Sequence, residues 1–207
     1  MEKQVVPDIV ISRLPLYLQI LNQMVREGYS AVSSQTIAER LGVTPTQLRK
    51  DLSYFGGFGK QGAGYQIFYL IDVLQKILHV DQIWQMALVG AGDLGRTLIN
   101  YQVLARHGFE ISLVFDDNPF RIGQVIGPLK VMNSDRLEKE IGCAGIKIAI
   151  LTLPVESAQK IADRLVACGV RAILCYTPVT LNLPDEVKVQ YVDAVQSLQK
   201  LTYYLSD

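Results

Sequence analysis

One segment restricts the fold of this chain more than any other. An apolar run, Met86-Ala87-Leu88-Val89, leads directly into Gly90-Ala91-Gly92-Asp93-Leu94-Gly95. A G-x-G-x-x-G pattern that follows a strand and opens a helix is typical of a dinucleotide-binding βαβ unit. The first glycine makes the turn, the second lets the backbone approach a pyrophosphate at the helix N-terminus, and the third lets helix and strand pack closely. We therefore expect cofactor contacts from Gly90, Ala91, Gly92, Asp93, Leu94 and Gly95.

A carboxylate follows at the spacing that such a unit requires. Asp116 ends the next apolar run, 21 residues after Gly95. At the end of the second strand it can accept hydrogen bonds from an adenosine ribose. With Asp117 beside it, this carboxylate repels a 2′-phosphate, so the sequence favours NAD⁺ and NADH over NADP⁺ and NADPH. The alternative is a glycine turn and a solvated acidic pair without a ligand.

The C-terminal part of the chain alternates between strand and helix patterns. We expect strands at residues 84–89, 109–115, 146–151 and 172–175, and helices at 93–104, 134–141 and 156–168. Strands that are apolar throughout and alternate with helices predict a parallel sheet covered on both faces. Residues 190–205 are predicted to form a last helix, whose apolar stripe is Val192, Val195, Leu198, Leu201 and Leu205.

The N-terminal part has a helical pattern instead. Helices are expected at residues 9–27, 36–41 and 44–54, with N-caps at 33–35 and at Thr44 and a turn at Gly42. Five glycines in residues 56–64 predict a hairpin, and a further helix follows at 67–79. Residues 80–82 form the expected domain boundary.

The two short helices have a helix–turn–helix outline, and the second presents Gln47, Arg49 and Lys50. Arg pairs with guanine edges or phosphates, Gln with adenine, and Lys with phosphates. The glycine-rich hairpin would be a wing that carries Lys60 to the DNA backbone or minor groove. A helical protein-interaction module with solvated charges also fits this spacing. The residues expected to contact DNA are Ser33, Ser34, Thr44, Gln47, Arg49, Lys50, Lys60 and Tyr65.

Composition excludes several other classes. The charges of twenty basic and twenty acidic residues cancel, so the net charge of zero does not by itself indicate a nucleic-acid partner. Three cysteines and two histidines show no metal-ligand spacing, and we expect no metal site. The sequence contains neither an apolar run of about 18 residues nor a signal peptide, which predicts a cytoplasmic protein without a membrane span.

Along essentially its whole length the chain resembles the Rex family of redox-sensing transcriptional repressors. The strings that carry the resemblance are Ser12-Arg13-Leu14-Pro15-Leu16-Tyr17, Gln47-Leu48-Arg49-Lys50-Asp51-Leu52-Ser53-Tyr54-Phe55-Gly56 with Gly59-Lys60, the glycine motif with Tyr101, Phe115-Asp116-Asp117-Asn118-Pro119, Pro154 with Ala158-Gln159, Pro178, and Val192-Asp193. The RKDLSYFG string, paired with a dinucleotide motif, makes the resemblance specific.

The resemblance implies an α/β fold in three parts. These are a winged-helix DNA-binding domain (residues 1–80), a Rossmann-type NAD(H)-binding domain (81–188) and a C-terminal domain-swapped dimerisation helix (189–207). It also implies a homodimer that binds inverted-repeat operator DNA and is released when NADH binds, while NAD⁺ competes without causing release. Tyr101 and Pro154 join the cofactor-binding residues, and Arg13, Tyr101 and Asp193 are implied to make contacts that change with the redox state.

Three departures from the family pattern affect these expectations. Gln61 stands where many members have a basic wing residue, which predicts a weaker wing contact. Cys175-Tyr176-Thr177 replaces a more usual Asn-Phe-Ala, and Ala194 is small where a bulky apolar residue is common. Both of these changes concern nicotinamide selectivity.

Two competing interpretations remain at this point. One is an enzyme, either an NAD-dependent dehydrogenase or a related nucleotide- or CoA-binding protein. It lacks a substrate domain here, and His107, inside the first βαβ unit, is a poor candidate for a catalytic group. The other is a DNA-binding protein whose Rossmann fold has lost its ligand, which the intact glycines and Asp116 disfavour.

Overall fold

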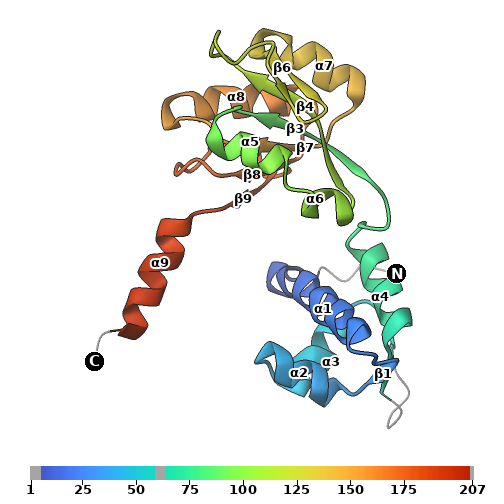
Figure 1. Cartoon of the computed structure of the whole chain (residues 1–207). Helices are drawn as coiled ribbons and strands as arrows, with labels where there is room; N and C mark the ends of the chain where they lie inside the picture. The colour runs from blue at the N-terminus through green and yellow to red at the C-terminus, as the bar shows by residue number, and fades with distance from the viewer. Residues whose placement is uncertain (1–5, 59–63, 206–207) are drawn as a thin grey trace. The chain divides into compact units, whose positions relative to one another are not determined.

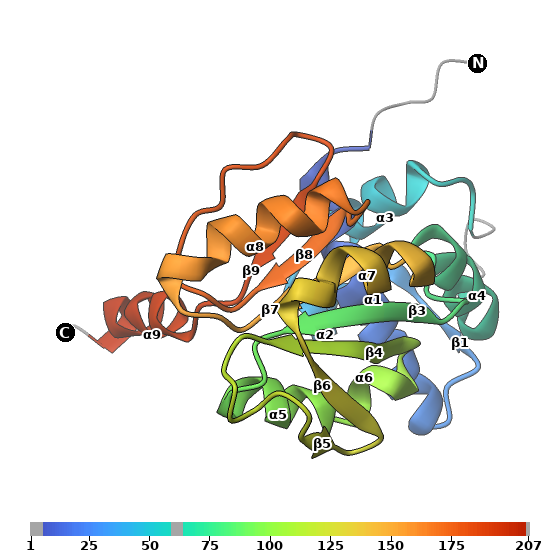
Figure 2. The ribbon, with the colours of Figure 1, turned by 90° about the horizontal axis from the view of Figure 1, so that it is seen from above.

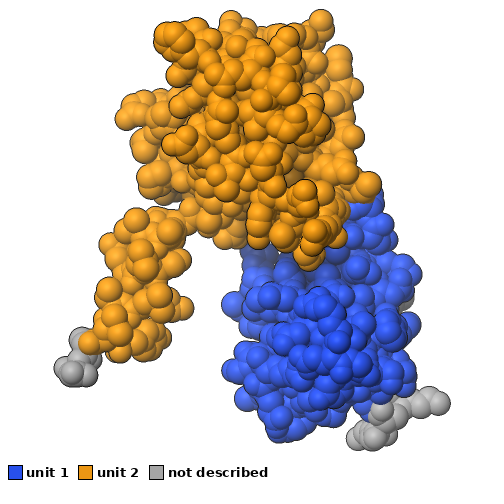
Figure 3. All heavy atoms as spheres, in the orientation of Figure 1, with its two compact units in different colours: residues 1–82 blue, residues 83–207 orange. Residues whose placement is uncertain are grey.

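The computed structural model describes residues 6–58 and 64–205 of this 207-residue chain. The chain divides into two compact units, unit 1 with residues 1–82 and unit 2 with residues 83–207 (Figure 3). Within the described ranges, no helix is both long and apolar enough to cross a membrane.

Unit 1 is a small helical domain, and its four helices begin and end within two residues of the predicted bounds. They are α1 (Asp8–Arg26), α2 (Ser34–Leu41), α3 (Pro45–Ser53) and α4 (Ile67–Ile77) (Figure 1). Pro15 lies inside α1. The buried faces of these helices meet in one apolar core that includes Leu14, Leu21, Ile37, Leu48 and Leu70.

The turn between α2 and α3 is fixed by local side chains. Ser33 Oγ accepts the N–H of Thr36 at 3.1 Å, and Thr44 Oγ1 accepts the N–H of Gln47 at 3.1 Å. These caps satisfy backbone donors that have no partner inside a helix. Gly42 ends α2 with φ of 67°, a left-handed conformation that glycine adopts without steric cost. The sequence therefore fixes where the helix–turn–helix bends.

The glycine-rich segment is described only in part. Strand β2 (Tyr65–Gln66) pairs antiparallel with β1 (Ala31–Val32), and residues 54–58, which include the first two of the five glycines, form no strand. Most of the predicted hairpin, residues 59–63, lies outside the described residues, so the hairpin stays a prediction. The strand that pairs with β2 comes from the segment before α2, and the glycine content of residues 56–64 gives no sign of that pairing. Lys60 and Gln61 lie outside the described residues.

Unit 2 is built on a seven-stranded sheet in the order β5-β6-β4-β3-β7-β8-β9. All neighbouring strands are parallel except β5 and β6, which are antiparallel. The strands are β3 (Trp84–Val89), β4 (Phe109–Asp116), β5 (Val125–Ile126), β6 (Leu129–Asn133), β7 (Ile148–Leu151), β8 (Ala172–Cys175) and β9 (Lys188–Tyr191). This confirms the predicted parallel sheet.

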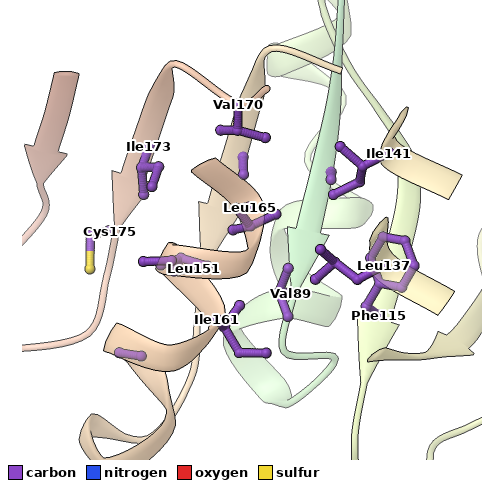
Figure 4. Packing of buried hydrophobic residues seen from close by; sticks show 14 of the residues in the cluster. Val89, Phe115, Leu137, Ile141, Leu151, Ile161, Leu165, Val170, Ile173 and Cys175 are labelled. Atoms are coloured by element: carbon purple, nitrogen blue, oxygen red, sulfur yellow. The ribbon is translucent and has the colours of Figure 1, made fainter. Parts of the chain in front are cut away.

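Helices cover both faces of this sheet (Figure 2). Ala87 and Val89 of β3 pack in one cluster with α7 (Leu137–Ala144) and α8 (Val155–Ala167) (Figure 4). Met86 and Leu88 belong to the cluster that includes Leu98 and Leu104, from the segment between β3 and β4. Side chains alternate across a strand, so a strand that is apolar throughout fits only a sheet buried on both faces.

The predicted helix at residues 93–104 is two helices. These are α5 (Asp93–Ile99) and α6 (Val103–Arg106), separated by residues 100–102. Asn100 Nδ2 donates to the carbonyl of Arg96 at 2.9 Å. The Asn100 N–H still bonds to the Arg96 carbonyl, but the Tyr101 N–H bonds to the carbonyl of Leu98, only three residues back, so the α-helix ends here. Tyr101 lies in this break and is exposed.

The C-terminal segment also differs from its prediction. The expected helix at residues 190–205 begins later, because residues 188–191 form the edge strand β9. The helix itself is α9 (Ala194–Thr202), followed by a 3₁₀ turn, η2 (Tyr203–Leu205). None of the α9 residues is buried. Two further strands, β5 and β6, and the 3₁₀ turn η1 (Ser134–Arg136) before α7 were not predicted either.

Candidate functional site

Two of the three glycines in the G-x-G-x-x-G motif are required by packing. Gly90 has φ of 107°, and a Cβ there would collide with the carbonyl oxygen of Thr152. A Cβ on Gly95 would collide with the carbonyl oxygen of Gly90. Thr152 Oγ1 also donates to the Gly90 carbonyl at 2.6 Å, which ties the loop to the end of β7. The loop therefore has one defined shape.

Gly92 is different, because nothing in the fold requires a glycine there. Its φ of −70° suits any residue. A Cβ at Gly92 would meet only the guanidinium of Arg121, with closest atoms at 3.7 Å, which is ordinary contact. The missing side chain at Gly92 therefore has no role in packing. It would let a ligand come close to the backbone, as the pyrophosphate does in dinucleotide-binding loops.

Asp116 is held beside this loop. Its Oδ2 accepts the Ala91 N–H at 2.7 Å and its Oδ1 accepts the Asn118 N–H at 2.7 Å. Arg121 Nη1 lies 3.2 Å from Oδ2. The carboxylate is buried, and these donors fix its orientation at the end of β4.

The loop and Asp116 meet at a defined place in the sheet. Strands β3, β4 and β7 are neighbours, and the strand order reverses between β3 and β7. In open α/β sheets, ligands bind outside the carboxyl ends of the strands at such a reversal. Pro154, which precedes α8, follows β7 at the same edge and is exposed, while Asp93 and Leu94 are exposed in the first turn of α5.

The fold of this chain does not bring Tyr101 to this edge. It lines a cavity of about 450 Å³ with Phe109 and Glu110, at the start of β4, whereas Asp116 ends that strand. At about 3.3 Å per residue, the two ends of β4 are roughly 23 Å apart. Leu98, Leu104 and Leu129 also line the cavity, so its wall is largely apolar.

The unusual Cys175-Tyr176-Thr177 segment follows the same sheet edge. Cys175 is buried in the core, and this burial raises the pKa of its thiol. Thr177 is also buried, and its Oγ1 donates to the carbonyl of Leu153 at 2.7 Å. Two of the three residues in this segment are therefore occupied in packing and internal hydrogen bonds.

In unit 1, the predicted DNA-contact residues group around α2 and α3. Ser33, Thr44, Arg49 and Lys50 are exposed, and Ser34 is half-buried. Arg49 Nη1 donates to Ser34 Oγ at 2.9 Å, so these two side chains lie together although they belong to different helices. The result is a polar, positively charged face at the helix–turn–helix.

Gln47 faces inward to a buried carboxylate. Asp51, on the next turn of α3, is fully buried and accepts from Gln47 Nε2 at 2.7 Å. It also accepts from Tyr17 at 2.5 Å and from Arg13, whose Nε and Nη2 lie at 2.6 and 2.8 Å. Burial alone would raise the pKa of Asp51, but these hydrogen bonds outweigh it and hold the pKa below its ordinary value. Arg13, predicted as a switch residue, therefore joins α1 to α3.

Three other candidate residues take part in packing or in hydrogen bonds within the chain. Tyr65 is buried in the unit 1 core, and burial raises the pKa of its hydroxyl. Asp193 is the N-cap of α9, and its Oδ1 accepts the N–H groups of Val195 and Gln196 at 2.8 and 3.2 Å. His107 Nδ1 is 2.8 Å from the carbonyl of Val103, at the end of α6. Among the described residues, no group of three or more His, Cys, Asp or Glu side chains could hold a metal ion.

Three residues that shape these sites were not among the predicted site residues. Thr152 fixes the glycine loop, Arg121 lies over Gly92 and Asp116, and Asp51 holds the inner face of α3. Only Asp51 gave a signal, since a charged residue between Leu48 and Leu52 occupies the apolar side of the helix. The other two depend on contacts between distant segments.

Known proteins are similar to both halves of the chain. Residues 5–53 match a family model described as "Putative DNA-binding protein N-terminus", and residues 81–179 match one described as "CoA binding domain". A redox-sensing transcriptional repressor Rex from Chloroflexus aurantiacus is 46% identical over 200 residues, which cover 97% of this chain and 94% of that protein.

Solved structures agree with this result. A crystal structure of RSP in complex with β-NAD⁺ and operator DNA has a TM-score of 0.93 and 38% identity, covering 98% of this chain and 93% of that one. A crystal structure of RSP in complex with β-NADH has a TM-score of 0.89 and 36% identity, covering 98% and 95%.

Proposed function

The chain belongs to the Rex family of redox-sensing transcriptional repressors, and from this premise we propose that it represses transcription according to the balance of NADH and NAD⁺. In this function it binds operator DNA through unit 1 and NAD⁺ or NADH through unit 2. It leaves the operator when NADH binds. Like the repressors it resembles, it is a regulator and not an enzyme.

The proposal that unit 2 binds NAD⁺ or NADH rests on one observation, the position of Gly92 near Asp116. Gly92 leaves its backbone bare without a structural need, and Asp116 stands beside it with a buried, oriented carboxylate. The first suits a pyrophosphate and the second suits the hydroxyls of an adenosine ribose. The residues expected to hold the dinucleotide are Gly90, Ala91, Gly92, Asp93, Leu94, Gly95, Asp116 and Pro154.

The DNA half rests on the polar face of α2 and α3. Arg49 and Lys50 supply positive charge, and Ser33, Ser34 and Thr44 supply short hydroxyls near helix N-termini. Such groups position a recognition helix on phosphates, while Arg also reads guanine edges. Because the Gln47 amide bonds to Asp51, base contact by Gln47 requires that this hydrogen bond be exchanged.

A homodimer is part of the proposal, because the apolar stripe of α9 is left uncovered within one chain. Val195, Leu198 and Leu201 are each about 60% exposed along one stripe. An isolated helix of this length is marginal in water, and stability in proteins comes from packing of the apolar face. We infer that residues 189–207 form a dimerisation segment that packs against a second copy of the chain.

The switch is then a shift between two arrangements of the dimer. A ligand shifts such an equilibrium only through its different affinity for the two states. Moving the population from 99:1 to 1:99 requires about 5.5 kcal/mol, which two NADH sites can share. Tyr101 lies far from Asp116 in its own subunit. We therefore propose that Tyr101 contacts a group across the dimer interface, either the nicotinamide half of the cofactor or Asp193.

Replacing Tyr101 by Phe tests this placement. The variant should bind NADH with little change and should release DNA less readily, because the hydroxyl that distinguishes the two states is gone. Arg13, which donates to Asp51 in this structure, is proposed to take part in the same switch. Unchanged sensitivity of DNA release to NADH in the Tyr101→Phe variant would remove Tyr101 from the mechanism.

The function as a whole is tested by fluorescence anisotropy of a labelled inverted-repeat operator. NADH is titrated at fixed NAD⁺ and at physiological salt, where non-specific phosphate contacts are weak. Release by micromolar NADH, but not by NADPH, is the expected result. Tight operator binding that ignores NADH would refute the redox-sensing part. Absence of specific binding would refute the repressor assignment for that operator. The protein is proposed to act in the cytoplasm, where both ligands are present.

A further inference from the structure

We propose that Arg121 is a phosphate-binding residue of the dinucleotide site and that its ion pair with Asp116 is exchanged for the dinucleotide when NAD⁺ or NADH binds. This inference rests on the proposed function of unit 2. It assigns a second charged group to a site in which the motif identifies only the carboxylate.

The position of Arg121 is the first argument. The closest atoms of its guanidinium lie 3.7 Å from the point that a Cβ on Gly92 would occupy. The cation therefore stands directly over the bare backbone that a pyrophosphate is expected to approach. Arginine offers a planar fork of donors that matches phosphate oxygens, and it does not lose its charge.

The hydrogen bonds of Asp116 supply the second argument. A carboxylate offers about four acceptor positions. Three are in use, by the N–H groups of Ala91 and Asn118 and by Arg121. Two ribose hydroxyls require two positions, so one of the present donors must leave for full ribose binding.

Arg121 is the donor that can leave. The two backbone donors lie at 2.7 Å and belong to the glycine loop and to the turn after β4, whereas Arg121 Nη1 lies at 3.2 Å on a long side chain that is 39% exposed. A guanidinium that gives up a carboxylate needs another anion nearby. A phosphate beside Gly92 supplies one within reach of the same side chain.

The backbone of Arg121 is well placed for this exchange. Its N–H donates to the carbonyl of Asn118 at 2.9 Å, and its carbonyl accepts from Gln124 at 3.0 Å. Asn118 in turn donates its N–H to Asp116. The loop thus stays anchored at Asp116 while the side chain moves. The exchange requires rotation of one side chain and no rearrangement of the sheet.

The test compares Arg121→Gln with Arg121→Lys and with the wild-type full chain. NADH binding is measured by fluorescence, and ADP and adenosine are measured as competitors. Loss of a charge-assisted contact should weaken NADH and ADP binding about tenfold in Arg121→Gln. Adenosine has no phosphate, so its affinity should stay unchanged or rise, since Asp116 is then free of its competitor. Arg121→Lys should recover most of the loss.

Arg136→Gln is the matched control, because it removes an exposed arginine that is also paired with a carboxylate, that of Glu140. It should leave all three affinities unchanged. An ADP-to-adenosine affinity ratio that is the same in Arg121→Gln and wild type would overturn the proposal. Equal tightening for all three ligands is one such case, and it would make Arg121 only an obstacle at Asp116. A wild-type protein that binds no NADH would instead refute the proposed function itself.

Discussion

Asp51 offers a stringent test of how unit 1 is held together. Its carboxylate is fully buried and accepts four hydrogen bonds, two from Arg13, one from Tyr17 and one from Gln47. It joins α3 to α1. The change to make is Asp51→Asn, which keeps the size of the side chain and removes its charge.

The magnitude follows from the geometry. Both oxygens of Asp51 accept from Arg13, so the amide NH₂ of an asparagine faces a guanidinium donor in either orientation. Removing one partner of a buried ion pair costs about 3–5 kcal/mol. The Arg13 side chain is 20% exposed, and water can take over part of its solvation. We therefore expect the lower end, about 3 kcal/mol, or roughly a hundredfold more opening of unit 1.

Hydrogen–deuterium exchange of the full chain, read by mass spectrometry on peptides from α1 and α3, measures this opening locally. The matched control is Asp72→Asn, in the same unit, whose ion pair with Lys76 at 2.8 Å is exposed on both sides. Exposed pairs contribute about 0–1 kcal/mol, so the control should change exchange by a few-fold at most. Equal effects of the two substitutions would refute the argument from burial.

The pH dependence of the same opening has a defined sign. The pKa of Asp51 in the folded chain lies below its ordinary value. A depressed carboxyl pKa contributes stability that is present above the unfolded pKa of about 3.9 and is lost as the pH falls through the folded pKa. The contribution of Asp51 to the stability of unit 1 should therefore be lost only in acid, and Asp51→Asn should remove that part of the pH dependence.

Three further results are expected. Gly92→Ala should leave the melting temperature unchanged but weaken NADH binding, whereas Gly95→Ala should destabilise the chain by about 1–3 kcal/mol or more because its Cβ meets the Gly90 carbonyl; equal losses of stability, by calorimetry, would contradict the distinction. Burial and the neighbouring Asp51 raise the pKa of Tyr17 to about 12, so the ultraviolet difference between wild type and Tyr17→Phe should show no tyrosinate near pH 10. Tyrosinate in that difference spectrum at ordinary alkaline pH would show that the burial argument fails. Leu198→Asp, on the exposed stripe of α9, should give a monomer in sedimentation, and a persistent dimer would locate the interface elsewhere.

Much of the fold was readable from the sequence because it depends on local chemistry. The helix ends at Ser33, Gly42 and Thr44 follow from side chains that cap their own backbone. The parallel sheet follows from apolar strands at regular intervals, and the G-x-G-x-x-G loop follows directly from its spacing. Each of these features is encoded within a few residues.

The errors share a different cause. Strand β2 pairs with β1, about thirty residues earlier in the chain, and β9 pairs with β8 where the sequence suggested the start of a helix. Short strands have little periodicity of their own, and their identity is settled by the partner. The break at residues 100–102 was also missed.

The candidate sites divide along the same line. The sequence by itself determined the cofactor loop, the carboxylate Asp116 and the polar face of α3, because residue type and spacing specify them. Only the tertiary structure decided that Gln47 and Arg13 bind Asp51, that Arg121 covers Gly92, and that Tyr101 stands at the far end of β4 from Asp116. The reason is physical: which donor reaches a buried carboxylate depends on distances between segments that no local pattern records.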